Sequence, residues 1–188
     1  MITTLLDYIK VYKNTLTSEE CDRIVLHPKN NETWDLCLPV WDKTRNYTIE
    51  NRRKCDHINI STEGKSYKEI DNMLYEKFSD VMKRHAEDSY LTLDVDSGYT
   101  LLKYEKGGGY IRHIDASRDV HRHISCVILL NDDFKGGELT FFGSDGIDEY
   151  TPEFNKGDMI LFPSNYMYPH TIKRVTSGTR YVVATWFR

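Results

Sequence analysis

The sequence predicts an α+β protein in which helices near the N-terminus support an antiparallel β core of barrel or jelly-roll type. Apolar residues recur at helical spacing in two stretches before residue 86, and from Tyr99 onward the period changes to two. The period-two part consists of short segments separated by Gly, Asn and Asp turn signals, which is typical of antiparallel barrels and jelly rolls and not of parallel sheets.

Two capping boxes mark where the helices begin. Thr17-Ser-Glu-Glu20 predicts a helix that ends before Pro28, and Ser66-Tyr-Lys-Glu69 predicts a longer one. The apolar stripe of the longer helix comprises Tyr67, Ile70, Leu74, Phe78, Val81, Met82 and His85. We interpret this stripe as the face that packs on the β core, with His85 a packed histidine and not a ligand.

The strands are expected in both parts of the chain. In the first part, short strands are expected at residues 8–13, where apolar and polar residues alternate, and at Lys54–Ile60. Residues 28–56 are otherwise expected to form loops. The β core is expected to consist of residues 98–105, 110–115, 122–131, 137–142, 147–151, 158–163, 170–175 and 179–187. We therefore expect one domain over residues 1–188, with helical support and flanking strands in 1–96 and the jelly-roll core in 97–188.

Composition narrows the class of partner. The 188 residues carry a net charge of −4, with 29% charged and 39% hydrophobic residues and a pI near 6.0. A broad cationic surface is thus absent, and no nucleic-acid partner is expected. No apolar run reaches the length of a membrane span, so no membrane partner is expected either.

The cysteines and the N-terminus favour a cytoplasmic location. Cysteines 21, 37, 55 and 126 show no zinc-binding spacing, and Cys21 and Cys126 lie in segments where a free thiol behaves as a small hydrophobe. No signal peptide is evident at the N-terminus. A reducing cytoplasm is the expected compartment.

A candidate metal site is formed by His113, Asp115 and His170. Side chains two apart on a strand share a face, so His113 and Asp115 are expected to point the same way. With His170 from another strand they can occupy one face of an octahedron and leave three positions open, which is the 2-His-1-carboxylate Fe(II) pattern. A structural zinc would need a fourth ligand, and no cysteine lies near these residues in the sequence.

Arg180 is the candidate anion-binding residue. It alternates with Val182, Ala184 and Trp186 on one face of the last predicted strand. A buried arginine needs a partner, and its planar fork fits a carboxylate of a small molecule or of the protein.

Single elements of this pattern are weak signals. His-x-Asp alone arises often by chance on surfaces. The competing His121-Arg-His123 pair has no matching carboxylate, so we interpret it as exposed or as supporting the metal ligands without binding the metal itself. The ordered combination of His113, Asp115, His170 and Arg180 on predicted strands favours the metal site.

The sequence resembles the 2-oxoglutarate/Fe(II)-dependent dioxygenase superfamily, in its prolyl 4-hydroxylase-like branch, over about residues 97–188. The motifs that carry the resemblance are Tyr104-x5-Tyr110-x2-His113-x-Asp115, Arg122 before an apolar strand, Gly136-Gly-Glu138, Lys156-Gly-Asp158, His170, Gly178-Thr-Arg180-Tyr181 and Thr185-Trp186. The stretch Leu16-Thr-Ser-Glu-Glu-Cys21 is similar to the opening helix of that branch.

The resemblance implies a double-stranded β-helix in which His113, Asp115 and His170 hold iron and Arg180 binds the far carboxylate of 2-oxoglutarate. It implies hydroxylation of an unactivated C–H bond with O2, with succinate and CO2 as coproducts and ascorbate as a reductant. Tyr104 matches a position near the cosubstrate. Tyr110, Arg122 and Trp186 match positions near the substrate, which favours a prolyl residue in a peptide or protein.

Two departures and several alternatives stay open. Leu129 and Leu139 occupy positions where relatives commonly have a hydroxyl near the far carboxylate, and Ser125 is a candidate substitute. A free amino acid or a lysyl side chain is an alternative substrate. A non-catalytic jelly-roll module that retains the metal site, or a zinc hydrolase on a β-barrel, is an alternative function.

Overall fold

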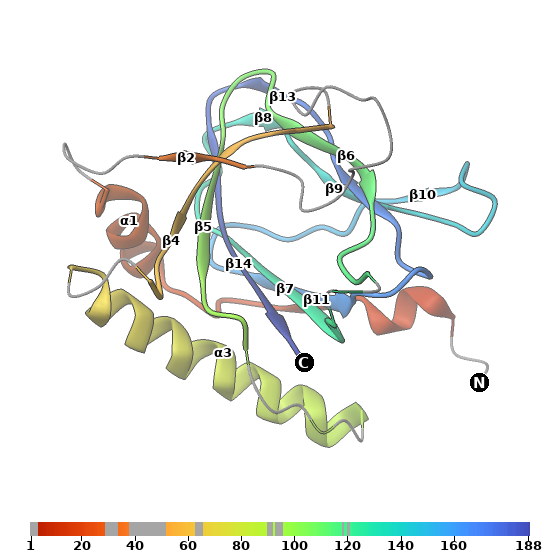
Figure 1. The fold of residues 1–188 in the computed structure, drawn as a ribbon, viewed down its shortest axis with the longest axis horizontal. Helices are drawn as coiled ribbons and strands as arrows, with labels where there is room; N and C mark the ends of the chain where they lie inside the picture. The colour runs from red at the N-terminus through yellow and green to blue at the C-terminus, as the bar shows by residue number, and fades with distance from the viewer. Residues whose placement is uncertain are drawn as a thin grey trace.

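Two β-sheets face each other, and a long helix covers the outer face of the larger one (Figure 1). The structure is a computed structural model that describes residues 4–28, 34–37, 52–62, 66–89, 92, 96–117, 119 and 121–188. Part of the loop region expected within residues 28–56 lies outside these described residues.

The larger sheet has seven strands in the order β1-β11-β7-β14-β5-β4-β2. Its strands are β1 (Lys10–Tyr12), β2 (Asp35–Leu36), β4 (Asp56–Asn59), β5 (Thr100–Tyr104), β7 (Ile124–Leu129), β11 (Met159–Pro163) and β14 (Arg180–Phe187). All their pairings are antiparallel, and the long β14 lies between β7 and β5.

The smaller sheet has five strands in the order β10-β9-β12-β6-β3. These are β3 (Arg53–Lys54), β6 (Gly109–His113), β9 (Leu139–Phe142), β10 (Glu149–Tyr150) and β12 (His170–Ile172). A separate pair joins β8 (Lys135–Gly136) to β13 (Val175–Ser177).

The helices begin close to where the sequence predicts. The Thr17 hydroxyl accepts from the Glu20 amide while the Glu20 carboxylate accepts from the Thr17 amide, which caps α1 (Ser18–Leu26) as expected. Helix α3 (Lys68–Ser89) follows the second capping pattern. A short 3-10 helix, η1 (Leu5–Tyr8), precedes β1 and was not expected, because one turn is too short to show a hydrophobic period.

Strict alternation along the central strands separates two environments. Ile128 and Val183 point outward and pack with α3, whereas Val182 and Ala184 point into the space between the sheets. The α3 stripe is buried as expected, and His85 at its end lies 3.0 Å from the Tyr12 hydroxyl. Helix α3 therefore covers one face of the larger sheet, and residues of the other face line a cavity.

The cysteines divide into two kinds. Cys21 and Cys126 are buried free thiols, as expected. Cys37 and Cys55 form a disulfide between the end of β2 and the link from β3 to β4, which the spacing alone did not indicate. In the part of the chain that the structure describes, no helix has the length and apolar character needed to span a membrane.

Packing of α3 on the sheet predicts a large stability cost for truncating its apolar stripe. Phe78 is fully buried, with its ring centroid 5.1 Å from that of Tyr99. We expect Phe78→Ala to lower the free energy of unfolding by about 3–5 kcal/mol, measured by urea denaturation. Tyr75→Ala on the exposed face of α3 is the matched control, with an expected change below about 1 kcal/mol. Equal effects would contradict this packing.

Candidate metal and ligand site

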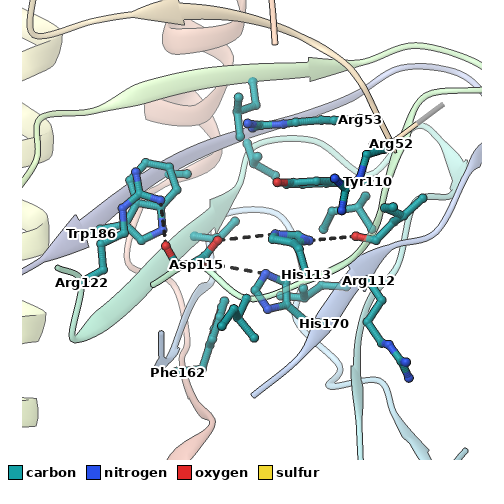
Figure 2. A pocket seen from close by; sticks show the side chains of 18 of the residues that line it. Arg52, Arg53, Tyr110, Arg112, His113, Asp115, Arg122, Phe162, His170 and Trp186 are labelled. Carbon is teal, nitrogen blue, oxygen red and sulfur yellow. Dashed lines mark hydrogen bonds and ion pairs between the residues drawn. The ribbon is translucent and has the colours of Figure 1, made fainter. Parts of the chain in front are cut away.

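His113 and His170 are brought together by strand pairing in the smaller sheet. His113 ends β6, His170 begins β12, and the two are Cα partners in the antiparallel register. Asp115 lies two residues beyond His113, in the bend that follows β6 and not on the strand itself. One donor atom from each of the three residues lies within 4.8 Å of the others (Figure 2).

Backbone carbonyl groups orient both imidazoles. The Nδ1 of His113 lies 2.9 Å from the Ile111 oxygen, and the Nδ1 of His170 lies 3.1 Å from the Tyr168 oxygen. Because a carbonyl oxygen only accepts, each Nδ1 carries the proton and each Nε2 presents its lone pair. The two Nε2 atoms lie 3.4 and 3.7 Å from the Asp115 carboxylate oxygens, so all three groups converge on one point.

The protonation states of the cluster suit a cation. Burial and then the nearby His113 ring lower the pKa of His170 to about 4, so this imidazole is neutral near pH 7. Burial acts to raise the pKa of Asp115, but the two imidazoles and the Ser125 hydroxyl outweigh it and hold that pKa well below its usual range. The imidazoles of His113 and His170 and the carboxylate of Asp115 are the donor set of a 2-His-1-carboxylate site.

A pair of buried serines holds the carboxylate in place. The Ser125 hydroxyl donates to Asp115 Oδ2 at 2.6 Å and shares a 2.7 Å hydrogen bond with the Ser164 hydroxyl. Ser125 was expected as a substitute partner for Arg180, and this expectation is wrong because its hydroxyl is directed to Asp115. Ser164 was missed by the sequence analysis, since nothing in its local pattern distinguishes it from a loop serine.

The cluster opens into a cavity of about 440 Å³ between the two sheets. Arg180, Val182, Ala184 and Trp186 of β14 all line it, as their alternation predicts. The remaining apolar wall is formed by Leu102, Val127, Leu139, Phe162 and Ile172. A pocket of this size, in which apolar walls lie beside charged side chains such as Arg180, is typical of a small-molecule site.

Arg180 is a buried cation without a complete set of partners. Its side chain is 2% exposed, and among the described residues its Nη1 atom has no hydrogen-bond partner. The guanidinium carbon lies 5.5 Å from the centroid of the Tyr104 ring, and burial lowers the pKa of Arg180 to about 10. A buried guanidinium with an unsatisfied N–H group favours an anion in the cavity.

Gly137 leaves the space that Arg180 fills. A Cβ atom at this position would lie 2.9 Å from Arg180 Cδ, and the backbone φ of +74° is also one that favours glycine. Only glycine satisfies both conditions here, which accounts for the second glycine of Gly136-Gly-Glu138.

The other predicted site residues also lie around this cavity. Tyr104, Tyr110, Arg122 and Trp186 all line it. Tyr104 is opposite Arg180 in the β5–β14 register, and the Tyr110 ring stacks on His113 with centroids 3.5 Å apart. The residues His121 and His123 are not part of the described three-ligand cluster.

Leu129 and Leu139, which stand where relatives commonly have a hydroxyl group, lie in different environments. Leu139 lines the cavity that holds Arg180, so its side chain offers no hydroxyl there. Leu129 instead packs in an apolar cluster with Tyr104 and Val182.

Comparison with known proteins agrees with this geometry. Residues 99–188 match the family model described as the 2OG-Fe(II) oxygenase superfamily, which confirms the resemblance found in the sequence. A PKHD-type hydroxylase from Colwellia psychrerythraea is 40% identical over 87 residues, covering 43% of this chain and 37% of that protein. Human prolyl 3-hydroxylase 2 is 42% identical over 67 residues, covering 35% of this chain and 10% of that protein.

The chain thus spans well under half the length of these curated relatives.

Solved structures show the same fold. A Trichoplax adhaerens prolyl hydroxylase, in complex with a hypoxia inducible factor peptide fragment, has a TM-score of 0.79 at 20% identity, covering 96% of this chain and 83% of that chain. A Pseudomonas putida prolyl-4-hydroxylase has a TM-score of 0.68 at 20% identity, covering 96% and 92%. These likenesses confirm the α+β class with a double-stranded β-helix core.

The serine pair predicts a measurable effect on metal binding. We expect Ser125→Ala to weaken Co(II) or Fe(II) binding by about 10- to 100-fold, because Asp115 loses the hydrogen bond that orients it. Anaerobic metal titration measures this, and Ser177→Ala on exposed β13 is the control with unchanged affinity. Full metal affinity in Ser125→Ala would remove the serine from the site.

Proposed function

We propose that this chain is a 2-oxoglutarate-dependent dioxygenase that hydroxylates an unactivated C–H bond, because residues 99–188 match the family model of the 2OG-Fe(II) oxygenase superfamily. The observation that carries the proposal is the convergence of His113, Asp115 and His170 in one cavity with the unsatisfied Arg180.

The residues fit the groups that this reaction needs. His113 and His170 would bind Fe(II) through Nε2, and Asp115 through its carboxylate. Arg180 would bind the far carboxylate of 2-oxoglutarate through the Nη1 atom that has no described partner, with Tyr104 beside it. When bound, iron, 2-oxoglutarate and O2 supply the oxidising chemistry, with succinate and CO2 as coproducts and ascorbate as a reductant.

The chain itself positions and shields these groups. The apolar walls formed by Leu139, Phe162 and Val182 exclude water from the region around Arg180, which strengthens its attraction for an anion. The hydrogen bonds to Ile111 and Tyr168 hold each imidazole in the tautomer that can bind metal.

We propose a prolyl residue in a peptide or protein as the substrate. Tyr110, Arg122 and Trp186 line the cavity and are only partly buried, and several relatives and structural neighbours are prolyl hydroxylases. A free amino acid or a lysyl side chain is the alternative substrate.

We also propose that residues 1–188 act as one domain. The first part supplies strands to both sheets, with β4 beside β5 and β3 beside β6, so the predicted division at residues 96 and 97 separates support from core but not two folding units.

A cytoplasmic location remains part of the proposal, and two observations bear on it. A reducing compartment would keep Fe(II) and the free thiols of Cys21 and Cys126 reduced. The Cys37–Cys55 disulfide is instead more typical of an oxidising compartment. The redox state of this pair in cells, read by thiol alkylation and mass spectrometry, decides between them.

Product analysis tests the reaction. We expect the protein with Fe(II), 2-oxoglutarate and O2 to add one oxygen atom to a proline-containing peptide, seen by mass spectrometry, with formation of succinate. His113→Ala or Asp115→Ala should reduce both products to background, because the ligand set is broken. Turnover that persists in these variants would contradict the assigned site, and zinc-dependent activity without O2 would support a hydrolase instead.

The role of Arg180 predicts a separate kinetic effect. We expect Arg180→Ala to raise the 2-oxoglutarate concentration for half-maximal decarboxylation by about 100-fold, because a charge-assisted bidentate interaction is lost. Arg23→Ala on exposed α1 is the control for loss of one positive charge. An unchanged requirement in the Arg180 variant would exclude it from cosubstrate binding.

A further inference from the structure

Arginine side chains gather at the mouth of the cavity. Arg52, Arg53, Arg112 and Arg122 line it, in addition to the buried Arg180. Asp115 is the acidic residue among the described lining residues, although the sequence as a whole carries a net charge of −4. The positive charge at this mouth is therefore local and opposite in sign to that of the whole chain.

Arg53 is held close to the metal ligands by a stack of rings. Its strand β3 pairs with β6, where Arg53 is the register partner of Tyr110. The Arg53 guanidinium carbon lies 4.8 Å from the Tyr110 ring centroid, and the Tyr110 ring lies parallel to His113 at an interplanar angle of 18° (Figure 2). Arg53 is thus one ring away from a proposed iron ligand.

The Arg53 side chain contacts the Tyr110 ring but has an incomplete set of hydrogen bonds. Its Nε atom is buried without a hydrogen-bond partner among the described residues. None of the ion pairs found in the described part of the chain includes Arg53 or Arg122. A partly buried guanidinium in this state favours an incoming anion.

Arg122 presents a second guanidinium on the other side of Asp115. Its guanidinium carbon lies 3.7 Å from the Trp186 ring centroid, and its Nη1 donates to the Asp115 backbone oxygen at 3.3 Å. Burial lowers the pKa of Arg122, the Asp115 carboxylate acts to raise it, and the positive charge of Arg53 lowers it again. The positive charge of Arg53 thus acts against that of Arg122, while the Asp115 carboxylate has the larger, opposite effect on Arg122.

The Arg112 side chain points in a different direction from those of Arg53 and Arg122. Figure 2 shows its guanidinium pointing away from Asp115, and it donates to the Gly146 oxygen at 3.2 Å. It does not form part of the Arg53 and Arg122 pair.

We propose that Arg53 and Arg122 bind a side-chain carboxylate of the substrate, so that the preferred substrate is an acidic peptide with Asp or Glu beside the residue that is oxidised. This inference rests on the proposed function and names its substrate class. Each guanidinium lies against an aromatic ring that orients its plane. Because Arg122 Nη1 already donates to the Asp115 backbone oxygen, its other N–H groups would bind the carboxylate together with Arg53.

An acidic peptide fits these observations better than a nucleic acid does. A nucleic-acid backbone needs a cationic surface that extends over several phosphates, whereas this pair of arginines serves one carboxylate at the mouth of a cavity of about 440 Å³. The net charge of −4 opposes a long polyanion but affects a short peptide with one or two carboxylates much less.

Binding of matched peptides tests the inference. Three short labelled peptides share a central proline whose neighbours on both sides are Glu, Gln or Lys. Fluorescence anisotropy measures their binding to the protein with Fe(II) and 2-oxoglutarate under anaerobic conditions, where no turnover occurs. We expect the Glu peptide to bind about tenfold more tightly than the Gln peptide and the Lys peptide to bind most weakly.

Substitutions test which arginines cause the preference for the Glu peptide. In Arg53→Gln and in Arg122→Gln the ratio between the Glu and Gln peptides should fall toward one. Arg53→Lys should give an intermediate ratio, because it keeps the charge but not the planar fork. Arg84→Gln on exposed α3 removes one positive charge far from the cavity and should keep the wild-type ratio.

The outcomes separate this inference from the proposed function. Equal binding of the Glu and Gln peptides by wild-type protein, or binding of none of the three, would overturn the inference. So would a single-stranded oligonucleotide that displaces the Glu peptide at a lower concentration than unlabelled peptide does. Failure of the wild-type protein to decarboxylate 2-oxoglutarate in air with any peptide would instead contradict the proposed function, and the anaerobic binding ratio would still decide the inference.

Discussion

The pairing of β6 with β12 is the constraint on which the candidate site depends. It places the last residue of one strand, His113, opposite the first residue of the other, His170. Both imidazoles then use a nearby backbone oxygen to fix their Nδ1 protons. A metal ligand set is assembled in this way from segments more than fifty residues apart in the sequence, without any ligand depending on a long flexible loop.

Side chains along each strand of the larger sheet alternate between its two faces, and this alternation lets the protein bury Arg180 while remaining folded. Residues of one parity pack against α3 and bury a continuous apolar face, so residues of the other parity are free to include Arg180. A buried guanidinium is costly when it lacks a partner. The surrounding core must offset this cost in the free protein, and an anion in the cavity would remove it. Burial and function are thus coupled through one side chain.

Much of this arrangement is predictable from local pattern. The period-two pattern predicted that one strand face carries Arg180, Val182, Ala184 and Trp186, and the capping boxes predicted where α1 and α3 begin. Contacts between distant segments were not predictable in this way. The disulfide between Cys37 and Cys55, the hydrogen bond of Ser125 to Asp115 and the position of Arg53 over Tyr110 all depend on tertiary geometry. Asp115 shows both cases, since its proximity to His113 was expected although it lies beyond the end of β6.

The arginines around the cavity differ in burial, and we assign them different ligands on that basis. Arg180 is 2% exposed and lies in an apolar environment, where it can hold a small anion away from water. Arg53 and Arg122 are only partly buried, and each lies against an aromatic ring that orients it. Because Arg180 is buried whereas Arg53 and Arg122 are only partly buried, an anion at the mouth and an anion at Arg180 need not compete for one position. A substrate carboxylate at the mouth would add to the effect of Asp115 in reducing the repulsion between Arg53 and Arg122, so these charges would favour an acidic peptide over a neutral one.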